Sequence, residues 1–253
     1  MSSTTLTFSH NTTNFVTELD PPIDLDSGKK YQAALVSLHT YNSIPNITHK
    51  NNKFRYYNGT NWKELIIPTG AYEVSFINNE LQRQMMLNED YNSEGNSFYV
   101  HISYNLPTSK STVDITHDDY IVDFTQENSI GSSLGFTSLQ LRKGFHESGN
   151  VINIEPVNAV LVHCDIIKDC YVNGKHSQVL YSFSPKVSPG YKIIERPNPQ
   201  LIFHSVINCP KISEIRIWLT DQNNKPIDLR GEVITIEILL KKLNKKNYIV
   251  KND

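Results

Sequence analysis

The sequence predicts an all-β protein built as an antiparallel β-sandwich, and three observations carry that prediction. Apolar and polar residues alternate along several runs, as they do in strands with one buried face. Turns rich in Asn, Gly and Pro separate these runs at the spacing of a sandwich, so about ten to twelve strands are expected. Strands do not alternate with helices, which makes a parallel α/β sheet an unlikely arrangement for this chain.

The first long strand is expected at residues 30–41, where KYQAALVSLHTY is mostly apolar on both faces. Such a strand suits a position that is covered on both sides. Residues 1–28 look irregular, with at most a short strand at 6–8. Farther on, Asn58-Gly59 lies between two β-prone runs, and because both residues tolerate positive φ, a hairpin is expected there.

The one long helix is expected over residues 73–87, EVSFINNELQRQMML, with Ser75 as its N-cap. Its buried stripe is expected to hold Phe76, Ile77, Leu81 and Met85.

Shorter elements follow the helix. Strands are expected at 97–104, 111–115 and 120–124, and then a helical turn at 129–134 that ends at Gly135 with Phe136 packed beneath it. Residues 137–150 look like an exposed loop. From residue 151 onward every apolar run is typical of a strand.

The clearest alternation lies in the ranges 214–220 and 232–242. Isoleucine and leucine occupy every second position in both, as a half-buried strand requires. The polar segment 221–226, DQNNKP, separates them, so a hairpin is expected. Its inner face is expected to consist of Ile215, Ile217, Leu219, Ile234, Ile236, Ile238 and Leu240.

Composition limits the classes of protein that fit. The formal net charge is −2 over 253 residues, which gives no argument for nucleic-acid binding by the whole chain. No apolar run approaches the length of a membrane span, and the N-terminus has no pattern of a secretory signal, so synthesis without a signal peptide is expected. Cys164, Cys170 and Cys209 are odd in number and lack CxxC spacing, which is typical of buried or half-buried thiols in a reducing compartment.

The last thirteen residues, 241–253, form a basic segment with five lysines and one aspartate. Such a tail could contact phosphate groups, including those of DNA, or an acidic partner. The simpler interpretation, which we favour, is a solvated terminus whose lysines protect an edge strand from pairing.

Motifs of the common enzyme classes are missing from the sequence. It holds no GxSxG, no glycine-rich phosphate loop, no HExxH and no GxGxxG. Cys164 follows His163 on an expected strand, so the two side chains face opposite sides and cannot line one site. A jelly-roll metal site would need histidines close together, and His101, His163 and His204 are the ones expected on strands, without metal-ligand spacing.

Two polar clusters resemble cation sites only in part. His117, Asp118 and Asp119 precede a strand, and a turn explains them more simply. In the second cluster Asp221, Asn223 and Glu232 fall at positions 1, 3 and 12 of a calcium loop. Position 5, however, is Lys225, and position 6 is Pro226 where the loop needs glycine, so an ordinary turn is expected.

Several segments have a distinctive wording: YQAALVSLHTYNSIPNI, the NN-x-F-x-Y run at 51–56, IIPTGAYEVSFINNELQ, NSIGSSLGF, DIIKDCYVNGKHSQVLYSFSP with PGYKIIERPNP, and IWLTDQNNKPIDLRGEVITIEILL. Together they resemble the minor capsid, or penton, proteins of virophages and polinton-type mobile elements. The resemblance runs along nearly the whole chain in a consistent order and contains no catalytic signature.

The resemblance implies an antiparallel jelly-roll β-sandwich that forms a pentamer at the vertices of the capsid of a small double-stranded DNA virus. It implies a location in the virion and, as partners, a homo-pentamer and a major capsid protein with two jelly rolls. The family is not known as an enzyme, so no catalytic, cofactor-binding or metal-binding residue is carried over. We expect one jelly-roll domain over 1–253, with an inserted or additional small β region around 45–125 and one or two short helices.

An alternative function is a carbohydrate- or receptor-binding β-sandwich without enzymatic activity, since jelly rolls serve as lectins as well as capsid proteins. The loops 58–62 and 222–226 would then carry the contacts. Aromatic residues in the chain alternate with aliphatic and acidic ones, which favours core packing or sugar stacking over nucleic-acid binding.

Overall fold

The computed structural model describes residues 3–154 and 157–243. It divides into two compact units, the first made of Met1–Ser43 with Val157–Asp253 and the second of Ile44–Pro156. Strands dominate both units and every ladder between named strands is antiparallel, so the expected all-β fold is confirmed. The region expected around 45–125 as an inserted β module lies within the second unit.

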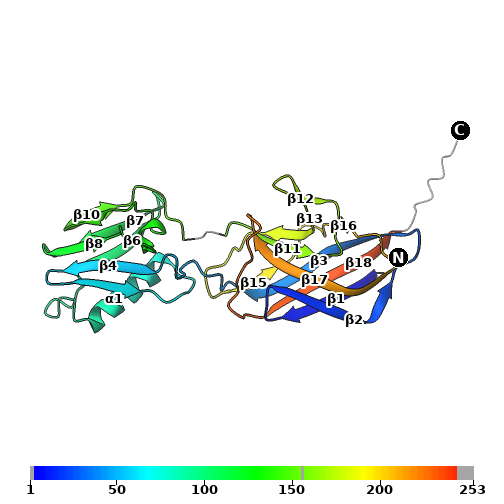
Figure 1. Ribbon diagram of the computed structural model, residues 1–253, viewed down its shortest axis with the longest axis horizontal. Coiled ribbons are helices and arrows are strands. Elements are labelled where there is room, and N and C mark those ends of the chain that lie inside the picture. The colour runs from blue at the N-terminus through cyan, green and yellow to red at the C-terminus, as the bar shows by residue number, and fades with distance from the viewer. Residues whose placement is uncertain (1–2, 155–156, 244–253) are drawn as a thin grey trace. The chain divides into compact units, whose positions relative to one another are not determined.

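The first unit is a β-sandwich (Figure 1). One sheet has the order β1-β18-β3-β15, with β16 also paired to β3, and the other has the order β14-β11-β17-β2. The strands are β1 Ser3–His10, β2 Asn14–Asp24, β3 Lys30–Tyr41, β11 Val160–Cys164, β12 Cys170–Val172, β13 Lys175–Ser177, β14 Val179–Phe183, β15 Lys192–Glu195, β16 His204–Ser205, β17 Lys211–Asp221 and β18 Ile234–Leu243.

The strand order is that of a jelly roll. Lettered B to I along the chain, the principal strands β1, β2, β3, β11, β14, β15, β17 and β18 give one sheet ordered B-I-D-G and another ordered C-H-E-F. The second unit is inserted between D and E, that is, between β3 and β11. The expected jelly-roll sandwich is therefore confirmed.

The expected hairpin at the C-terminus is wrong. β17 pairs with β11 and β2, whereas β18 pairs with β1 and β3, so the two strands belong to opposite sheets and residues 222–233 cross between them. Their apolar faces are nevertheless buried as predicted: Ile217 and Ile238 have no exposed surface. Alternation identifies the face that a strand buries, but two such faces can lie against each other across a sandwich without sharing hydrogen bonds.

The N-terminal residues also differ from the expectation of irregular structure. β1 and β2 are long strands, yet each buries only one large side chain, Phe8 and Phe15. Their ladders to β18 and β17 hold them in place, and both lie at sheet edges, where the prolines at positions 21 and 22 are tolerated. A strand with so little apolar alternation forms because a neighbouring strand pairs with it, and its own sequence does not predict it.

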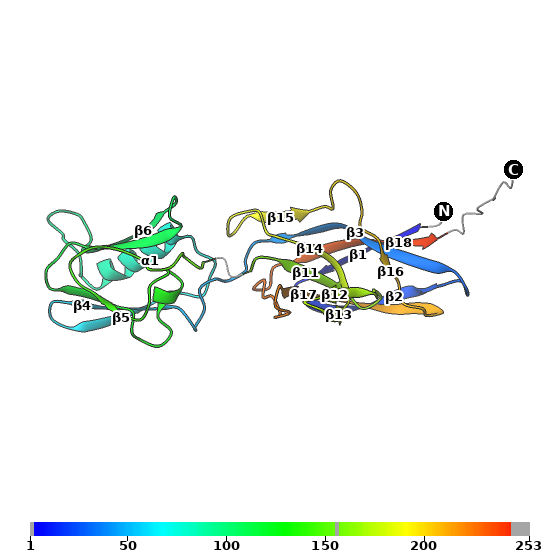
Figure 2. The ribbon, with the colours of Figure 1, turned by 90° about the horizontal axis from the view of Figure 1, so that it is seen from above.

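The second unit has its own hydrophobic core, with two small sheets ordered β5-β4-β8-β9 and β10-β7-β6 and the helix α1 packed on β6 (Figure 2). The predicted hairpin at Asn58-Gly59 is confirmed, with Gly59 at φ 90°. Its elements are β4 Lys53–Asn58, β5 Trp62–Ile66, α1 Val74–Leu87, β6 Val100–Asn105, β7 Lys110–Ile115, β8 Tyr120–Asp123, the 3-10 turn η1 Ile130–Ser132, β9 Gln140–Leu141 and β10 Gly144–Glu147.

The helix α1 was located correctly but two details were wrong. Its N-cap is Glu73, without a side-chain hydrogen bond, and not Ser75. Phe76 is 56% exposed, because the buried stripe runs along the next face of the helix; that stripe consists of Val74, Ile77, Asn78, Leu81 and Met85.

Two further expectations concern the segment after β8. The helical turn near residue 130 is confirmed: the Ser129 hydroxyl accepts a hydrogen bond from the Gly131 N–H, Gly135 has φ 81° and Phe136 is buried. The exposed loop expected at 137–150 is wrong, because β9 pairs with β8 and β10 pairs with β7. Short strands of this kind bring the number in the described residues to eighteen, above the ten to twelve expected.

The burial of β17 predicts a large effect of truncating its inner face. Replacing Ile217 by Ala should lower the free energy of unfolding by about 2–5 kcal/mol, because it removes a fully buried side chain and leaves a cavity. Replacing Glu214, an exposed residue of the same strand, by Ala should change it by less than about 0.5 kcal/mol. Chemical denaturation followed by tryptophan fluorescence measures both, and equal effects would contradict the assignment of the inner face.

Candidate functional site

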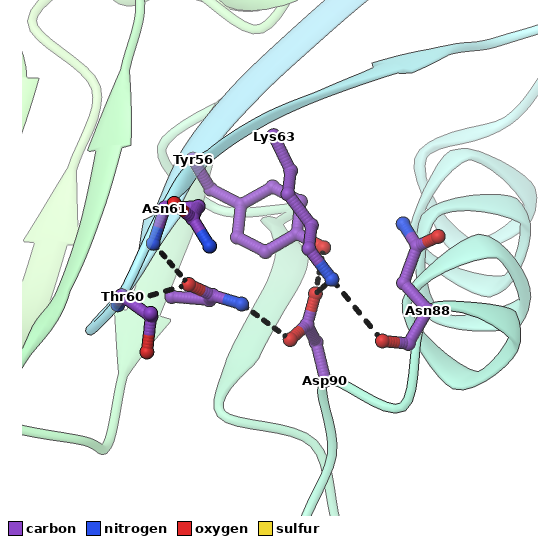
Figure 3. Close-up of polar contacts among 7 residues, drawn as sticks. Tyr56, Thr60, Asn61, Lys63, Asn88 and Asp90 are labelled. Carbon is purple, nitrogen blue, oxygen red and sulfur yellow. Dashed lines mark hydrogen bonds and ion pairs between the residues drawn. The ribbon is translucent and has the colours of Figure 1, made fainter.

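A polar network in the second unit surrounds the carboxylate of Asp90 (Figure 3). Its Oδ2 accepts a hydrogen bond from the Tyr56 hydroxyl at 2.5 Å and pairs with the Lys63 ammonium at 2.8 Å. Its Oδ1 accepts from the Asn58 side-chain amide at 2.8 Å. The Lys63 ammonium also donates to the backbone carbonyl of Asn88 at 3.1 Å.

Backbone geometry after α1 brings Asp90 to this place. The helix ends at Leu87, and Glu89 then adopts a positive φ of 62°, which reverses the chain. The Asp90 N–H donates back to the Met85 carbonyl at 2.9 Å. The carboxylate therefore points to the β4–β5 hairpin, which supplies Tyr56, Asn58 and Lys63.

The electrostatics of this network favour an ionised carboxylate beside a neutral phenol. Burial alone would raise the pKa of Asp90, but hydrogen bonds from Lys63, Tyr56 and Asn58 outweigh burial and hold that pKa below its usual value. Burial and the hydrogen bond to Asp90 raise the pKa of Tyr56. Each oxygen of Asp90 is engaged, so the network acts as a clamp between the end of α1 and the hairpin.

The clamp presents the loop 58–62, one of the two loops expected to carry glycan contacts. The Asn58 side-chain oxygen accepts hydrogen bonds from the Thr60 and Asn61 N–H groups, which fixes the turn. At its end Trp62 is 40% exposed, with its ring 5.5 Å from that of Tyr57 and the Arg55 guanidinium 4.5 Å from its centroid. The loop thus holds an ordered aromatic side chain at the surface.

The two cation-like clusters are turns, as expected. Asp118 pairs with Lys143 at 2.9 Å, and the Asp119 N–H donates to His117 Nδ1. In the other cluster Asp221 Oδ1 accepts from the backbone N–H groups of Asn223 and Lys225. Within residues 3–154 and 157–243 no three His, Cys, Asp or Glu side chains gather as metal ligands would.

The structure separates the candidate histidines. His101 lies on β6 in the second unit, and His163 and His204 lie on β11 and β16 in the first. Strands also carry His10, His146 and His176, which were not expected there, and His39, which lies in the expected strand 30–41.

The cysteines include one buried thiol and one contact that the sequence did not indicate. Cys164 is fully buried, and burial raises its pKa to about 12, so its thiolate is not available as a nucleophile at neutral pH. Cys170 Sγ lies 3.3 Å from His204 Nδ1. Burial raises the pKa of Cys170 and lowers that of His204, so both groups stay neutral. Residues 34 apart come together here next to the isolated bridge between Ile167 and Val206, which no local motif reveals.

The expected basic segment 241–253 begins inside β18. Lys242 pairs with Asp26, and the Lys241 ammonium lies 5.2 Å from the centre of the Phe203 ring. Residues 244–253 lie outside the described residues. In the part of the chain that is described, no helix is long and apolar enough to cross a membrane.

Comparison with known proteins identifies a similar fold. No protein-family model matches the sequence, and no curated protein matches it. Among solved structures, the mavirus penton protein aligns with 96% of this chain and 100% of its own, with a TM-score of 0.51 and 10% identity. The chain has a fold similar to that of the mavirus penton protein. A chain of the Sputnik virophage aligns with 93% of this chain and 97% of its own, at 12% identity and a TM-score of 0.45.

The alignment with the mavirus penton protein bears on the resemblance found in the sequence. It extends over nearly all of both chains, so it includes the inserted unit as well as the jelly roll. The expected likeness to virophage penton proteins is therefore confirmed for the fold.

The clamp predicts a pH-dependent stability. Replacing Asp90 by Ala should lower the free energy of unfolding by about 1–3 kcal/mol at pH 7, because it leaves the buried Tyr56 hydroxyl without its acceptor and removes the ion pair of the part-exposed Lys63. Since the pKa of Asp90 is lower in the folded protein, its stabilisation is present above the unfolded value of about 4 and is lost as pH falls through the folded pKa. Urea denaturation between pH 2.5 and 7 measures this.

The matched control for that prediction is Asp118→Ala, which removes an exposed ion pair with Lys143 and should leave stability nearly unchanged. In the Asp90 variant the loss of stability below pH 4 should be shallower than in the wild type. Equal slopes in the two proteins would contradict an ionised Asp90 in the clamp.

Proposed function

We propose that this chain is a structural capsid protein, the pentameric vertex protein of a virophage- or polinton-like double-stranded DNA virus. The observation that carries the proposal is the alignment of almost the whole chain with the whole mavirus penton protein. The proposal places the chain in the virion, in contact with a double-jelly-roll major capsid protein. It assigns a structural role without catalysis, supported by the inert Cys164 thiol and the separated histidines.

The edges of the jelly roll support assembly into a ring. A closed ring of identical subunits uses heterologous contacts, in which one patch meets a different patch of the neighbour. Val16 on β2 is 50% exposed, and Ile194 on β15 is 56% exposed beside Tyr191 at 68%. These exposed apolar side chains lie on edge strands of different sheets, so each sheet of the first unit offers one candidate contact for a neighbouring subunit.

Electron micrographs of the purified protein, alone and with the major capsid protein of the same particle, test the proposal. Five-fold rings are expected, because exposed apolar edges become buried only in the ring. Replacing Ile194 by Glu should reduce the number of rings at least tenfold, whereas Lys192→Glu, an exposed residue on the same face of β15, should leave them. Absence of rings both in the protein alone and in its mixture with the major capsid protein would contradict the vertex assignment.

A second test concerns the Lys-rich C-terminal tail, for which contact with packaged DNA is the alternative to the solvated terminus that we favour. Deleting 244–253 removes three lysines and keeps β18 intact, including the Lys242 pair with Asp26. The deletion should weaken DNA binding and flatten its salt dependence, by up to about 0.9 in the logarithmic slope for each phosphate that the tail neutralises. Filter binding at 50–200 mM salt measures both, and unchanged affinity and slope would refute the contact.

A further inference from the structure

A cavity of about 560 Å³ lies at one end of the jelly roll, within the first unit. It is found where β3 begins at Lys30 and β18 ends at Leu243, two residues that face each other in the ladder. The turn between β2 and β3, the segment 205–210 before β17 and residues 168–169 form its walls. Its volume falls within the range of about 300–1,000 Å³ that is typical of small-ligand sites.

Backbone hydrogen bonds join these walls to one another. The Leu25 N–H donates to the Pro210 carbonyl at 2.8 Å, which connects the β2–β3 turn with the segment before β17. The Lys168 N–H donates to the Ser205 carbonyl at 3.1 Å, which connects the third wall with that same segment. A cavity with ordered walls needs little reorganisation when it takes up a ligand.

Three lysines supply the charge that points to a ligand. Lys29 and Lys30 come from the β2–β3 turn and the start of β3, and Lys168 comes from the wall after β11. Within residues 3–154 and 157–243 none of their three ammonium groups forms an ion pair. Because a lysine side chain is a flexible four-carbon stem, all three can reach an anion placed in the cavity.

Two carboxylates line the same cavity, and one of them is already neutralised. Asp26 pairs with Lys242 on β18. Asp169 forms no ion pair in the described part of the chain. Three unpaired ammonium groups and one unpaired carboxylate leave two positive charges around the space. The cavity therefore attracts an anion and disfavours a cation.

A phosphate monoester matches this charge better than a carboxylate does. It carries about −1.5 to −2 at pH 7 and has three strong acceptor oxygens, one for each lysine. A carboxylate brings a single charge and two oxygens. The hydroxyl groups of Ser27 and Ser205 and the side-chain amide of Asn208 also line the cavity and are further donors.

The rest of the lining favours a phosphate that is attached to an organic body. Leu25 and Val206 are buried in the wall, and Ile207 and Leu243 line the same space. A phosphate ion alone would fill little of the volume and would leave these apolar side chains in contact with water. An apolar group on the ligand would cover them, which is favourable.

We propose that this cavity binds a phosphate monoester with an apolar body, whose phosphate is held by Lys29, Lys30 and Lys168. The inference goes beyond the proposed capsid role and does not rest on it, so its failure would leave the vertex assignment in place. It puts a ligand site at the end of the jelly roll where β18 leads into the Lys-rich tail.

Isothermal titration calorimetry on the full chain tests the proposal with four matched compounds. Phenyl phosphate should bind saturably with a Kd in the millimolar range or below. Phenol lacks the phosphate, inorganic phosphate lacks the apolar body, and benzoate replaces the phosphate by a carboxylate. Each of these three should bind at least tenfold more weakly than phenyl phosphate.

Variants of the lysines locate the binding. Lys30→Gln and Lys168→Gln should each weaken the binding of phenyl phosphate at least fivefold, because each removes a charge-assisted hydrogen bond to the phosphate. Lys211→Gln is the matched control. Lys211 is exposed at the same end of the sandwich, opposite Asp24 in the ladder, but does not line the cavity. Its substitution should change the affinity less than twofold.

Three results would overturn the proposal. They are no saturable binding of phenyl phosphate, benzoate binding as tightly as phenyl phosphate, and an equal loss of affinity in the Lys211 and Lys168 variants. Equal binding of benzoate would assign the cavity to an acidic peptide instead. Competition by thymidine monophosphate would support a free nucleotide as the source of the phosphate, and competition by a 5′-phosphorylated thymidine oligonucleotide alone would support a DNA end.

Discussion

The burial of two isoleucine-rich faces against each other is the constraint on which the rest of the structure depends. Ile217 on β17 and Ile238 on β18 have no exposed surface, and they belong to opposite sheets. Because both faces need an apolar partner, the chain between them crosses the sandwich instead of turning back as a hairpin. The principal strands form sheets with the orders B-I-D-G and C-H-E-F. In these orders β15 is an edge strand of the first sheet and β2 an edge strand of the second.

The second unit buries its apolar side chains in a core of its own. It enters and leaves the jelly roll between β3 and β11, and its core is separate, so the insertion adds a unit without interrupting either sheet of the sandwich. Within it, the Asp90 clamp joins the end of α1 to the β4–β5 hairpin. A closed polar network of this kind fixes the loop that carries Trp62, so an exposed aromatic side chain is presented in one conformation.

The sequence predicted the elements whose evidence is local. The bounds of β3 match the expected 30–41, because that strand is mostly apolar on both faces, and the hairpin at Asn58-Gly59 follows from two residues that tolerate positive φ. Pairing was not predictable in this way, since alternation in β17 and β18 defines a buried face and no partner. The sequence did not predict β1 and β2 as long strands, because their Thr, Ser and Pro residues produce little apolar alternation. The Asp90 clamp and the contact between Cys170 and His204 join residues far apart in sequence, and only the fold brings them together.

The proposed assembly as a vertex protein rests on the jelly roll with its inserted unit and on the alignment with the mavirus penton protein. Multi-angle light scattering over a range of protein concentrations tests that conclusion most directly. A vertex protein is expected to reach a plateau at five times the 28.9 kDa mass of the chain. A plateau at the mass of one chain, maintained at high concentration and in the presence of the major capsid protein, would contradict it.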